Sequence, residues 1–439
     1  MTFPRYPAYK DSGVTWLEEV PEHWEVKRLK QICHVFPSNV DKKSYDGETP
    51  VRLCNYTDVY YNERIVDSME PMAATATTEQ IEKFTLKAGD TIITKDSETA
   101  DDIAIAAYVP EDLPGIICGY HLSMVRPKDQ TCGLFVKRLF DSTYVKSKFE
   151  VLANGLTRVG LGTYALDNVE MPIPPAAEQT AIATFLDRET AKIDDLIAEQ
   201  RSLTALLKEK RQAVISHAVT KGLNPDAPMK PSGVEWLGDV PEHWEVMPAK
   251  RVSSVFVPQR NKPDLNTDGE GHFWVTMEQM RNEEINSAEF SVTESAAKDA
   301  GTRVLSAGAV VASCVGTFGL AAINSVDVII NQQLQAFIPT DHIDAKFMRH
   351  CVIVAQCYFE QIGTSATIAY VNQLGFANMP MVLPPMFEQY QIVEFLALES
   401  AKFDTLTTEA QRAIDLLQER RTALISSAVT GQIDVRKTT

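Results

Sequence analysis

An internal repeat constrains this chain more than any other feature. Residues 12–26 return as residues 232–246, and twelve of these fifteen positions are identical. A second block, residues 174–220, returns as residues 384–430. Both copies of this block open with Pro-Pro-x-x-Glu-Gln and close with Ile-Ser-x-Ala-Val-Thr. Two repeats that keep the same order indicate a duplicated architecture.

The sequence between the repeats is not duplicated. Residues 27–166 and 247–375 barely resemble each other, although each lies between the same two blocks. Duplication for a purely structural role does not explain why nearly identical frames hold different contents, so we expect two different surfaces in equivalent positions. The layout that follows is a common motif at 1–26, the first variable domain at 27–166, a long helix at 167–222, a linker and repeated motif at 223–246, the second variable domain at 247–375, and a second long helix with a tail at 376–439.

Each Pro-Pro-x-x-Glu-Gln motif is followed by about 43 residues that contain neither proline nor glycine. Apolar residues in these stretches follow the alternating three- and four-residue spacing of a coiled coil. The expected seam includes Leu196 and Leu203 in the first copy and Leu406 in the second. A helix of this size extends about 65 Å at 1.5 Å per residue, which corresponds to roughly two turns of B-DNA.

Four charged residues interrupt the two seams and predict how the helices pair. Glu189 and Glu399 lie near the helix starts, whereas Lys210 and Arg420 lie near the ends. Antiparallel pairing sets Glu189 against Arg420 and Lys210 against Glu399, and such half-buried pairs can specify orientation. We predict an antiparallel coiled coil with the variable domains at opposite ends. The alternative is that these charges are solvated at the edge of a larger bundle.

The charge balance is acidic, with a net charge of −17. The first variable domain carries 17 basic and 19 acidic side chains, and the second carries 9 and 13. Neither is a basic block, so we expect any binding of nucleic acid by the chain alone to be weak, with other proteins supplying much of the positive surface. The seven cysteines form no Cys-x-x-Cys pair, which favours reduced thiols in the cytoplasm over disulfides or a zinc site.

No membrane association is expected. The N-terminus lacks the basic start and apolar core of a signal peptide. Residues 304–326 carry no charge, but glycines at 308, 316 and 319 favour a pair of short strands over a spanning helix.

Motifs of catalysis are missing from the sequence. No Gly-Lys dipeptide occurs, which argues against a P-loop, and no His-Glu-x-x-His or metal-ligand cluster is present. No Asn-Pro-Pro-Tyr element occurs, and the nearest match, residues 224–227, reads Asn-Pro-Asp-Ala. We therefore expect no catalytic residue, no metal and no cofactor in this chain.

The tryptophans and histidines of the common motif invite a catalytic interpretation. Because they stand before two unlike domains, we expect them instead to pack each domain onto a helix end. They are Trp16, His23, Trp24, Trp236, His243 and Trp244.

The ordered motifs resemble those of the specificity (S) subunits of Type I restriction-modification systems, over essentially the whole chain. The matching elements are Trp-Leu-x-x-Val-Pro-x-His-Trp, Pro-Pro-x-x-Glu-Gln and Ala-Val-Thr, each present twice. The resemblance implies two target recognition domains that read a bipartite, asymmetric site in double-stranded DNA. It implies two methyltransferase subunits docked on the helices, with restriction subunits joining them. The partners would use S-adenosylmethionine, ATP and Mg²⁺.

Both variable domains are expected to be mixed α/β (α+β), so the whole chain is two such domains joined by two long helices in a pseudo-two-fold repeat. A shared pattern, Leu86-x-Ala-Gly in one and Leu305-x-Ala-Gly in the other, leads into a polar or glycine-rich loop. Arg and Lys read guanine, Asn and Gln read adenine, and Lys, Ser and Thr hold phosphates. On residue type and loop position the candidate DNA contacts are Lys42, Lys43, Tyr45, Lys95, Arg158, Gln259, Arg260, Asn261, Lys262, Thr317, Gln332, Gln333 and Thr367.

Two other functions fit parts of the sequence. A coiled-coil scaffold without DNA specificity would suit the acidic balance, but not the duplicated frame around unlike contents. A single-chain nuclease or methyltransferase would need the motifs that are missing.

Overall fold

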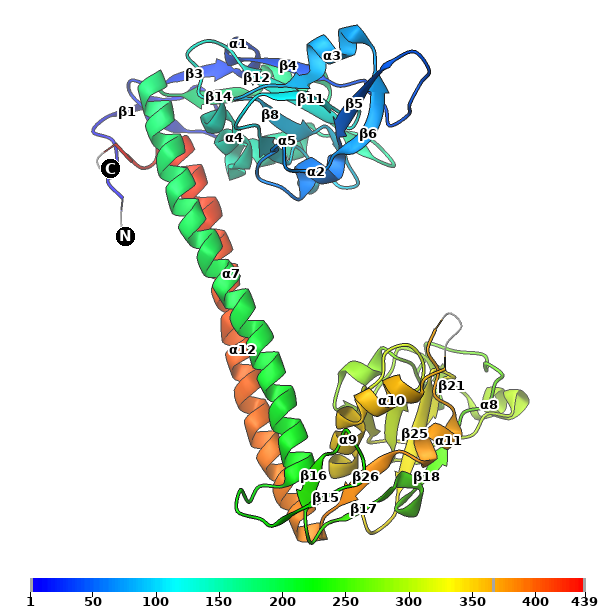
Figure 1. The fold of residues 1–439 in the computed structure, drawn as a ribbon. Helices are drawn as coiled ribbons and strands as arrows, with labels where there is room; N and C mark the ends of the chain where they lie inside the picture. Colours follow the sequence, from blue (N-terminus) through cyan, green and yellow to red (C-terminus); the bar gives the residue numbers. More distant parts are fainter. Residues whose placement is uncertain (1–2, 365–367, 437–439) are drawn as a thin grey trace. The chain divides into compact units, whose positions relative to one another are not determined.

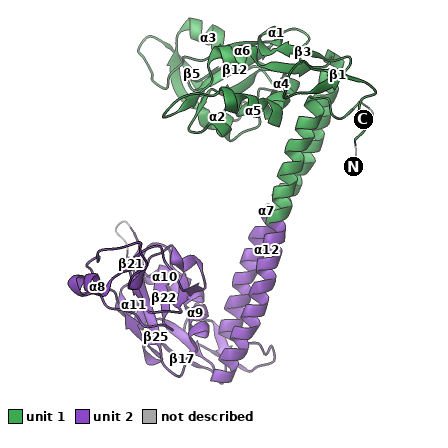
Figure 2. Ribbon diagram, turned by 180° about the vertical axis from the view of Figure 1, so that it is seen from behind, with its two compact units in different colours: residues 1–201, 411–439 green, residues 202–410 purple. Residues whose placement is uncertain are grey.

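The computed structural model describes residues 3–364 and 368–436. Figure 1 labels the helices and strands. The chain divides into two compact units, residues 1–201 with 411–439 (unit 1) and residues 202–410 (unit 2), which Figure 2 shows in different colours. Each unit holds one variable domain and segments of both long helices.

The first variable domain of unit 1 is built on two four-stranded sheets. One is antiparallel in the order β10-β8-β12-β4, and the other has the order β6-β5-β11-β7 with β11 parallel to β5. The strands are β4 (Cys33–Pro37), β5 (Thr49–Cys54), β6 (Met72–Ala76), β7 (Thr85–Leu86), β8 (Thr91–Thr94), β10 (Ala106–Tyr108), β11 (Leu113–Cys118) and β12 (Leu122–Pro127). The helices are α1 (Leu29–Ile32), α2 (Tyr56–Tyr60), α3 (Thr78–Phe84), α4 (Gly133–Asp141), α5 (Thr143–Leu152) and α6 (Thr163–Asn168).

The second variable domain, in unit 2, has a five-stranded sheet in the order β18-β25-β22-β23-β20 and a three-stranded sheet in the order β21-β19-β24. The uncharged stretch near residue 315 forms the antiparallel pair β22 and β23, as expected from its glycines. The elements are β18 (Ser253–Phe256), β19 (His272–Val275), β20 (Glu284–Ile285), β21 (Ser291–Val292), β22 (Val310–Ser313), β23 (Ala321–Asn324), β24 (Val328–Ile330), β25 (Leu334–Pro339), α8 (Glu294–Ala300), α9 (Ala345–Val354), α10 (Gln356–Ile362) and α11 (Gln373–Ala377).

The repeated blocks form the same small ladders in both units. The strand that follows the common motif pairs antiparallel with the strand just before the long helix, as β3 with β14 in unit 1 and as β17 with β26 in unit 2. A two-stranded hairpin precedes each ladder. These strands are β1 (Tyr9–Asp11), β2 (Glu19–Pro21), β3 (Glu25–Arg28), β14 (Glu170–Ile173), β15 (Met229–Pro231), β16 (Asp239–Pro241), β17 (Glu245–Pro248) and β26 (Pro380–Leu383).

The two long helices are α7 (Ala176–Lys221) and α12 (Met386–Val429). Within each unit they run antiparallel. In unit 1, Ile193 and Ile197 near the start of α7 pack against Ile414 in the second half of α12. In unit 2, Arg211 near the end of α7 binds Asp404 in the first half of α12. The predicted antiparallel orientation is therefore confirmed.

The predicted seam was wrong at every second position, where the residue that faces the other helix is the next one along the chain. Leu196, Leu203 and Leu406 are each at least 44% exposed, whereas the neighbouring Ile197 is 7% exposed. The reason is that residues 196 and 197 are both apolar, so the sequence permits either seam. Thr204 and Thr407, which follow Leu203 and Leu406, are half-buried, so the observed seam also contains polar residues.

The predicted ion pairs between the helices were wrong as well. Glu189 binds Arg188 and Lys192 of its own helix, and Glu399 binds Lys402. Lys210 and Arg420 are exposed. Ion pairs that do join the helices are Arg421 with Asp194 in unit 1 and Arg211 with Asp404 in unit 2. Each arginine is the residue after the predicted cation, and each aspartate lies five residues beyond the predicted glutamate.

The corrected seam can be tested by paired alanine substitutions in the free chain. Ile197→Ala should lower the free energy of unfolding by about 2–4 kcal/mol, because it leaves a cavity between the helices. Leu196→Ala should change it by less than about 0.5 kcal/mol, because that side chain already faces solvent. Urea unfolding followed by circular dichroism measures both, and equal effects would contradict the assigned seam.

Candidate nucleic-acid interface

The second repeated block holds each variable domain on its helix through the Glu-Gln pair of the Pro-Pro-x-x-Glu-Gln motif. In unit 1 the buried carboxylate of Glu178 accepts a hydrogen bond from Trp24 Nε1 at 3.1 Å, and it lies 2.7 Å from His23 Nε2. Gln179 accepts a hydrogen bond from the backbone N–H of Cys132 at the start of α4, at 2.9 Å. Trp24 and His23 thus pack at the helix end, as expected, whereas Trp16 of the same motif is 50% exposed.

Unit 2 repeats this arrangement with its own residues. Glu388 accepts from Trp244 Nε1 at 2.8 Å and lies 2.7 Å from His243 Nε2. Gln389 accepts from the backbone N–H of Asp344, the residue before α9, at 2.8 Å. Two unlike domains are therefore fixed to their helices by the same four side chains.

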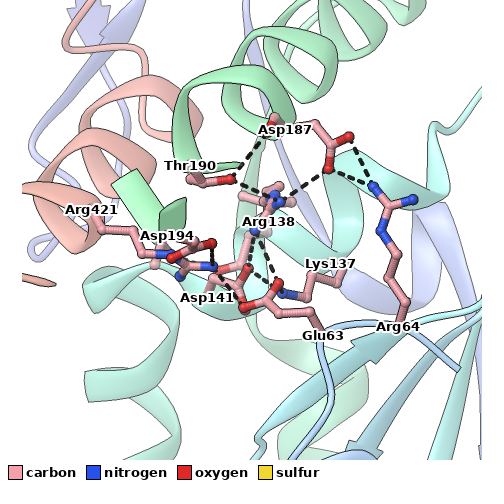
Figure 3. A network of polar contacts seen from close by, with 11 residues as sticks. Glu63, Arg64, Lys137, Arg138, Asp141, Asp187, Thr190, Asp194 and Arg421 are labelled. Atoms are coloured by element: carbon pink, nitrogen blue, oxygen red, sulfur yellow. Dashed lines mark hydrogen bonds and ion pairs between the residues drawn. The ribbon is translucent and has the colours of Figure 1, made fainter. Parts of the chain in front are cut away.

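Unit 1 adds a network of charges between the first variable domain and both helices (Figure 3). The carboxylate of Glu63 binds Lys137 and Arg138 of α4 and, at 2.8 Å, Arg421 of α12. Arg138 also reaches Asp187 of α7, at 3.3 Å. Burial alone would raise the pKa of Glu63, but the positive charges of Lys137 and Arg421 outweigh it and lower the pKa to about 2. The network fixes the domain against the helix pair.

The corresponding region of unit 2 is sparser. Arg349 of α9 binds Glu283 at 3.2 Å, and the neighbouring His350 is 7% exposed. Burial lowers the pKa of His350 to about 3, with further lowering by the charges of Arg349 and Arg211. His350 is therefore neutral in the folded chain at any pH near neutrality.

The buried histidine predicts a pH dependence of stability. Between about pH 6.5 and 3 the unfolded chain binds a proton at residue 350 that the folded chain does not bind. Stability should therefore fall as the pH drops below 6.5, by up to about 1.4 kcal/mol per pH unit. His350→Leu should flatten the dependence of urea unfolding between pH 6.5 and 5, whereas His217→Leu, at an exposed position of α7, should leave it unchanged. An unchanged slope in His350→Leu would contradict this assignment.

The candidate DNA contacts of the first variable domain lie in two places. Lys42, Lys43 and Tyr45 are exposed on the loop between β4 and β5, where the Tyr45 hydroxyl donates to Asp41 at 3.1 Å. Asp41 raises the pKa of Tyr45 through that hydrogen bond. These three side chains face solvent and are free to meet a phosphate backbone.

Lys95 and Arg158, far apart in the sequence, lie close together. Both flank Asp96, and Arg158 Nη2 lies 2.7 Å from the Asp96 carboxylate. Lys95 donates to the carbonyl of Ser38 at 2.9 Å, and its ammonium lies 4.5 Å from the ring centre of Tyr120. Burial lowers the pKa of Lys95. Basic side chains interleaved with aromatic rings are typical of nucleic-acid surfaces.

Sequence reasoning missed the residues that organise this cluster. Asp96, Tyr56, Tyr120 and His121 were not among the candidate DNA contacts. His121 lies 2.8 Å from an Asp96 oxygen and is partly exposed. The sequence places tyrosines at 56, 60 and 61, which could have marked Tyr56, but it carries no signal for Asp96.

The candidates of the second variable domain are also partly brought together. Gln332 Nε2 donates to the backbone carbonyl of Gln259 at 2.9 Å, and the side chains of Gln332 and Gln333 are exposed beside it. Arg260, Asn261 and Lys262 follow on the same exposed loop, and Thr317 is exposed between β22 and β23. Thr367 lies outside the described residues.

Two searches of the described residues were negative. Residues 3–364 and 368–436 hold no group of three or more His, Cys, Asp or Glu side chains arranged to bind a metal ion. Within the same ranges, no helix combines the length and apolar character needed to cross a membrane.

The chain belongs to the family described as the Type I restriction modification DNA specificity domain, whose sequence profile matches residues 21–203 and 241–414. It is 22% identical over 449 residues to the putative type I restriction enzyme MjaX specificity subunit of Methanocaldococcus jannaschii, with 98% of both chains covered. It is 22% identical over 336 residues to the type I restriction enzyme EcoKI specificity subunit of Escherichia coli, over 73% of this chain and 68% of that one.

Solved structures share the fold. A chain from work on complex assembly and conformational transition of the type I R-M system matches with a TM-score of 0.73 and 16% identity, over 93% of this chain and 98% of that one. The HsdS subunit from Thermoanaerobacter tengcongensis matches with a TM-score of 0.54 and 17% identity, over 94% and 98%. The expected fold class, two mixed α/β domains with long helices, is confirmed.

Proposed function

We propose that this chain is the DNA-specificity subunit of a Type I restriction-modification complex and reads a bipartite, asymmetric site in double-stranded DNA. The observation that carries the proposal is that the repeated motifs and helices are nearly identical, whereas the two variable domains that they hold are different. Trp24 with Glu178 and Trp244 with Glu388 make the same contact, yet they hold domains whose exposed loops differ in most of their candidate residues. Two equivalent positions with unlike surfaces suit two unlike half-sites.

The long helices support a fixed spacing between the half-sites. α7 has 46 residues and α12 has 44, so each extends about 65–70 Å. Each helix is continuous through both units. Helices of that length suit two base sequences separated by an unspecified gap.

The acidic balance of the chain fits a subunit that does not hold DNA alone. With a net charge of −17, its own phosphate contacts are too few to dominate affinity. Partner subunits therefore supply much of the positive surface in the assembled complex.

The outer faces of the helices provide a docking surface for two methyltransferase subunits. Six leucines on these helices are between 44% and 61% exposed, which is unusual for a surface without a partner. Restriction subunits join the complex through the methyltransferases. The leucines are Leu196, Leu203 and Leu206 of α7 and Leu398, Leu406 and Leu416 of α12.

A hollow at the start of α12 in unit 2 extends this surface. It has a volume of about 630 Å³ and is lined by Phe387, Phe395 and Leu398, with Glu388 at its polar edge. We place an apolar segment of a methyltransferase subunit here.

Unit 1 fills the equivalent position with its own N-terminal segment. Phe3 packs edge-on against Phe185, which corresponds to Phe395, with ring centres 5.4 Å apart. The Tyr6 hydroxyl donates to Glu178 at 2.6 Å. The two methyltransferase subunits therefore dock on unequal surfaces.

The chemistry belongs to the partners, and this chain is not an enzyme. Its sequence lacks the P-loop and the Asn-Pro-Pro-Tyr element that ATP use and adenine methylation would require. The methyltransferase subunits use S-adenosylmethionine, and the restriction subunits use ATP and Mg²⁺. The free cysteines of the described chain fit a complex that works in the cytoplasm.

The decisive experiment maps methylated adenines across the genome of a methylation-free host that expresses this chain with its methyltransferase subunit. The expected result is one motif of two short, different sequences separated by a fixed gap. Methylation at a continuous short sequence would contradict the two-domain reading. A stable complex that methylates no specific sequence would favour the scaffold alternative.

The docking surface predicts the effect of single charges on assembly. Leu406→Glu and Leu416→Glu should each weaken methyltransferase binding by about tenfold or more, because they place a charge in an apolar contact. Gln418→Glu, at an exposed position of the same helix, is the matched control and should bind normally. Native mass spectrometry of titrated mixtures measures the affinity, and equal binding by all three variants would place the interface elsewhere.

A further inference from the structure

A short pair of strands, which was not predicted from the sequence, positions the backbone next to Arg158. β9 (Asp96–Ser97) pairs antiparallel with β13 (Val159–Gly160), with Asp96 opposite Gly160 and Ser97 opposite Val159. The backbone N–H of Leu161 donates to the carbonyl of Lys95 at 2.9 Å and extends the pairing. Residue 158 therefore lies at the end of a ladder, beside the carboxylate of residue 96.

Asp96 is bound from both sides. Arg158 Nη2 approaches one carboxylate oxygen at 2.7 Å, and His121 Nδ1 lies 2.8 Å from the other. The Asp96 side chain is only 18% exposed, so the contact is partly shielded from water. A carboxylate anchored by a second residue fixes the direction of a guanidinium better than a surface carboxylate does.

About half of the Arg158 side chain remains exposed to solvent. Its exposed fraction is 48% although one nitrogen is bound to Asp96, and the central guanidinium carbon lies 6.0 Å from the ring centre of Tyr56. Tyr56 in turn stacks on Tyr60, with ring centres 5.5 Å apart. A guanidinium has five N–H donors in a planar fork, so several still point away from the carboxylate.

We propose that Arg158, positioned by Asp96, reads a guanine of the first half-site through the O6 and N7 acceptors at its major-groove edge. Two parallel N–H donors of one guanidinium match those two acceptors, and arginine to guanine is the commonest specific contact of this kind. Asp96 is a positioning residue, because it acts on the base through Arg158. This assignment rests on the proposed function and names the base that one side chain recognises.

The second variable domain has a different pair at the equivalent place. In the first domain Gly160 pairs with both Asp96 and Asn154. In the second domain Tyr370 pairs in the same way with Val315 and residue 364, so Tyr370 corresponds to Gly160 and Val315 to Asp96. Counting back from these pairs, Ile368 corresponds to Arg158, and it is 63% exposed. One position thus carries a charged hydrogen-bond donor in one domain and an apolar side chain in the other, as unlike half-sites require.

The test uses the assembled complex of this chain with its methyltransferase subunits and the site found by genome mapping. Methyl transfer is measured on duplexes in which each base pair of both half-sites is changed in turn. A second set replaces each guanine by 7-deazaguanine, which lacks the N7 acceptor but still pairs with cytosine. Arg158→Ala should lose the preference for guanine, worth about 5- to 150-fold, at one position of one half-site.

The double comparison isolates the contact. In the wild-type complex 7-deazaguanine at that position should slow methylation at limiting DNA, and in Arg158→Ala it should have no further effect. Asp96→Asn should weaken the same preference in part, and Arg158→Lys should not restore it fully, because lysine offers no planar fork. Arg52→Ala is the matched control, since Arg52 binds Asp67 at 2.6 Å in the same domain and is 41% exposed.

The outcomes separate the two levels of the proposal. If Arg158→Ala weakens methylation of every duplex by the same factor and lowers the salt dependence, Arg158 contacts a phosphate and the assignment is overturned. If 7-deazaguanine acts equally on wild type and Arg158→Ala at every position, it is also overturned, while the proposed function stands. The proposed function itself would be contradicted only if the wild-type complex showed no preference for a bipartite DNA sequence. Unchanged discrimination at the second half-site in all variants confirms that they are folded.

Discussion

The structure depends on how the Glu-Gln pair at the start of each long helix is satisfied. Glu178 accepts a hydrogen bond from the indole N–H of the fully buried Trp24, and Gln179 accepts one from the backbone N–H of Cys132, the residue before α4. A buried carboxylate without donors would cost several kcal/mol, so the common motif, the domain and the helix must come together at once. Because unit 2 meets the same demand with Glu388 and Gln389, the loops between these anchors are free to differ.

The same constraint explains where rigidity is placed. In unit 1 the domain is further tied to both helices by Glu63, its three cationic partners and the contact of Arg138 with Asp187. In unit 2 the ion pair of Arg349 with Glu283 joins two parts of the domain itself. These contacts lie on the side of each domain that faces its helices. The candidate DNA contacts lie on exposed loops elsewhere, so a change of loop sequence leaves the attachment intact.

Repetition and periodicity made the two domains and the two long helices predictable from sequence. The antiparallel direction was predicted from four charged residues, and it is correct although those residues do not form the expected pairs. The seam itself was not predictable, because Leu196 and Ile197 are adjacent and equally apolar, and only the position of the other helix decides which is buried. Only part of the cluster formed by Lys95, Asp96, His121 and Arg158 was predicted from the sequence. Arg158 and Lys95 could be chosen by residue type, but Asp96 could not, since its role comes from a two-residue strand pair between segments about sixty residues apart.

The two ion pairs between the helices have a consequence for shorter chains. Arg421 with Asp194 and Arg211 with Asp404 are copies of one contact, so each half of the sequence carries both the arginine and the aspartate of the pair. A polypeptide containing one half alone therefore carries both partners of this ion pair, and two identical molecules paired helix against helix would form it twice. Its two domains would then be the same, and the DNA sequence that such a dimer selects would be a palindrome.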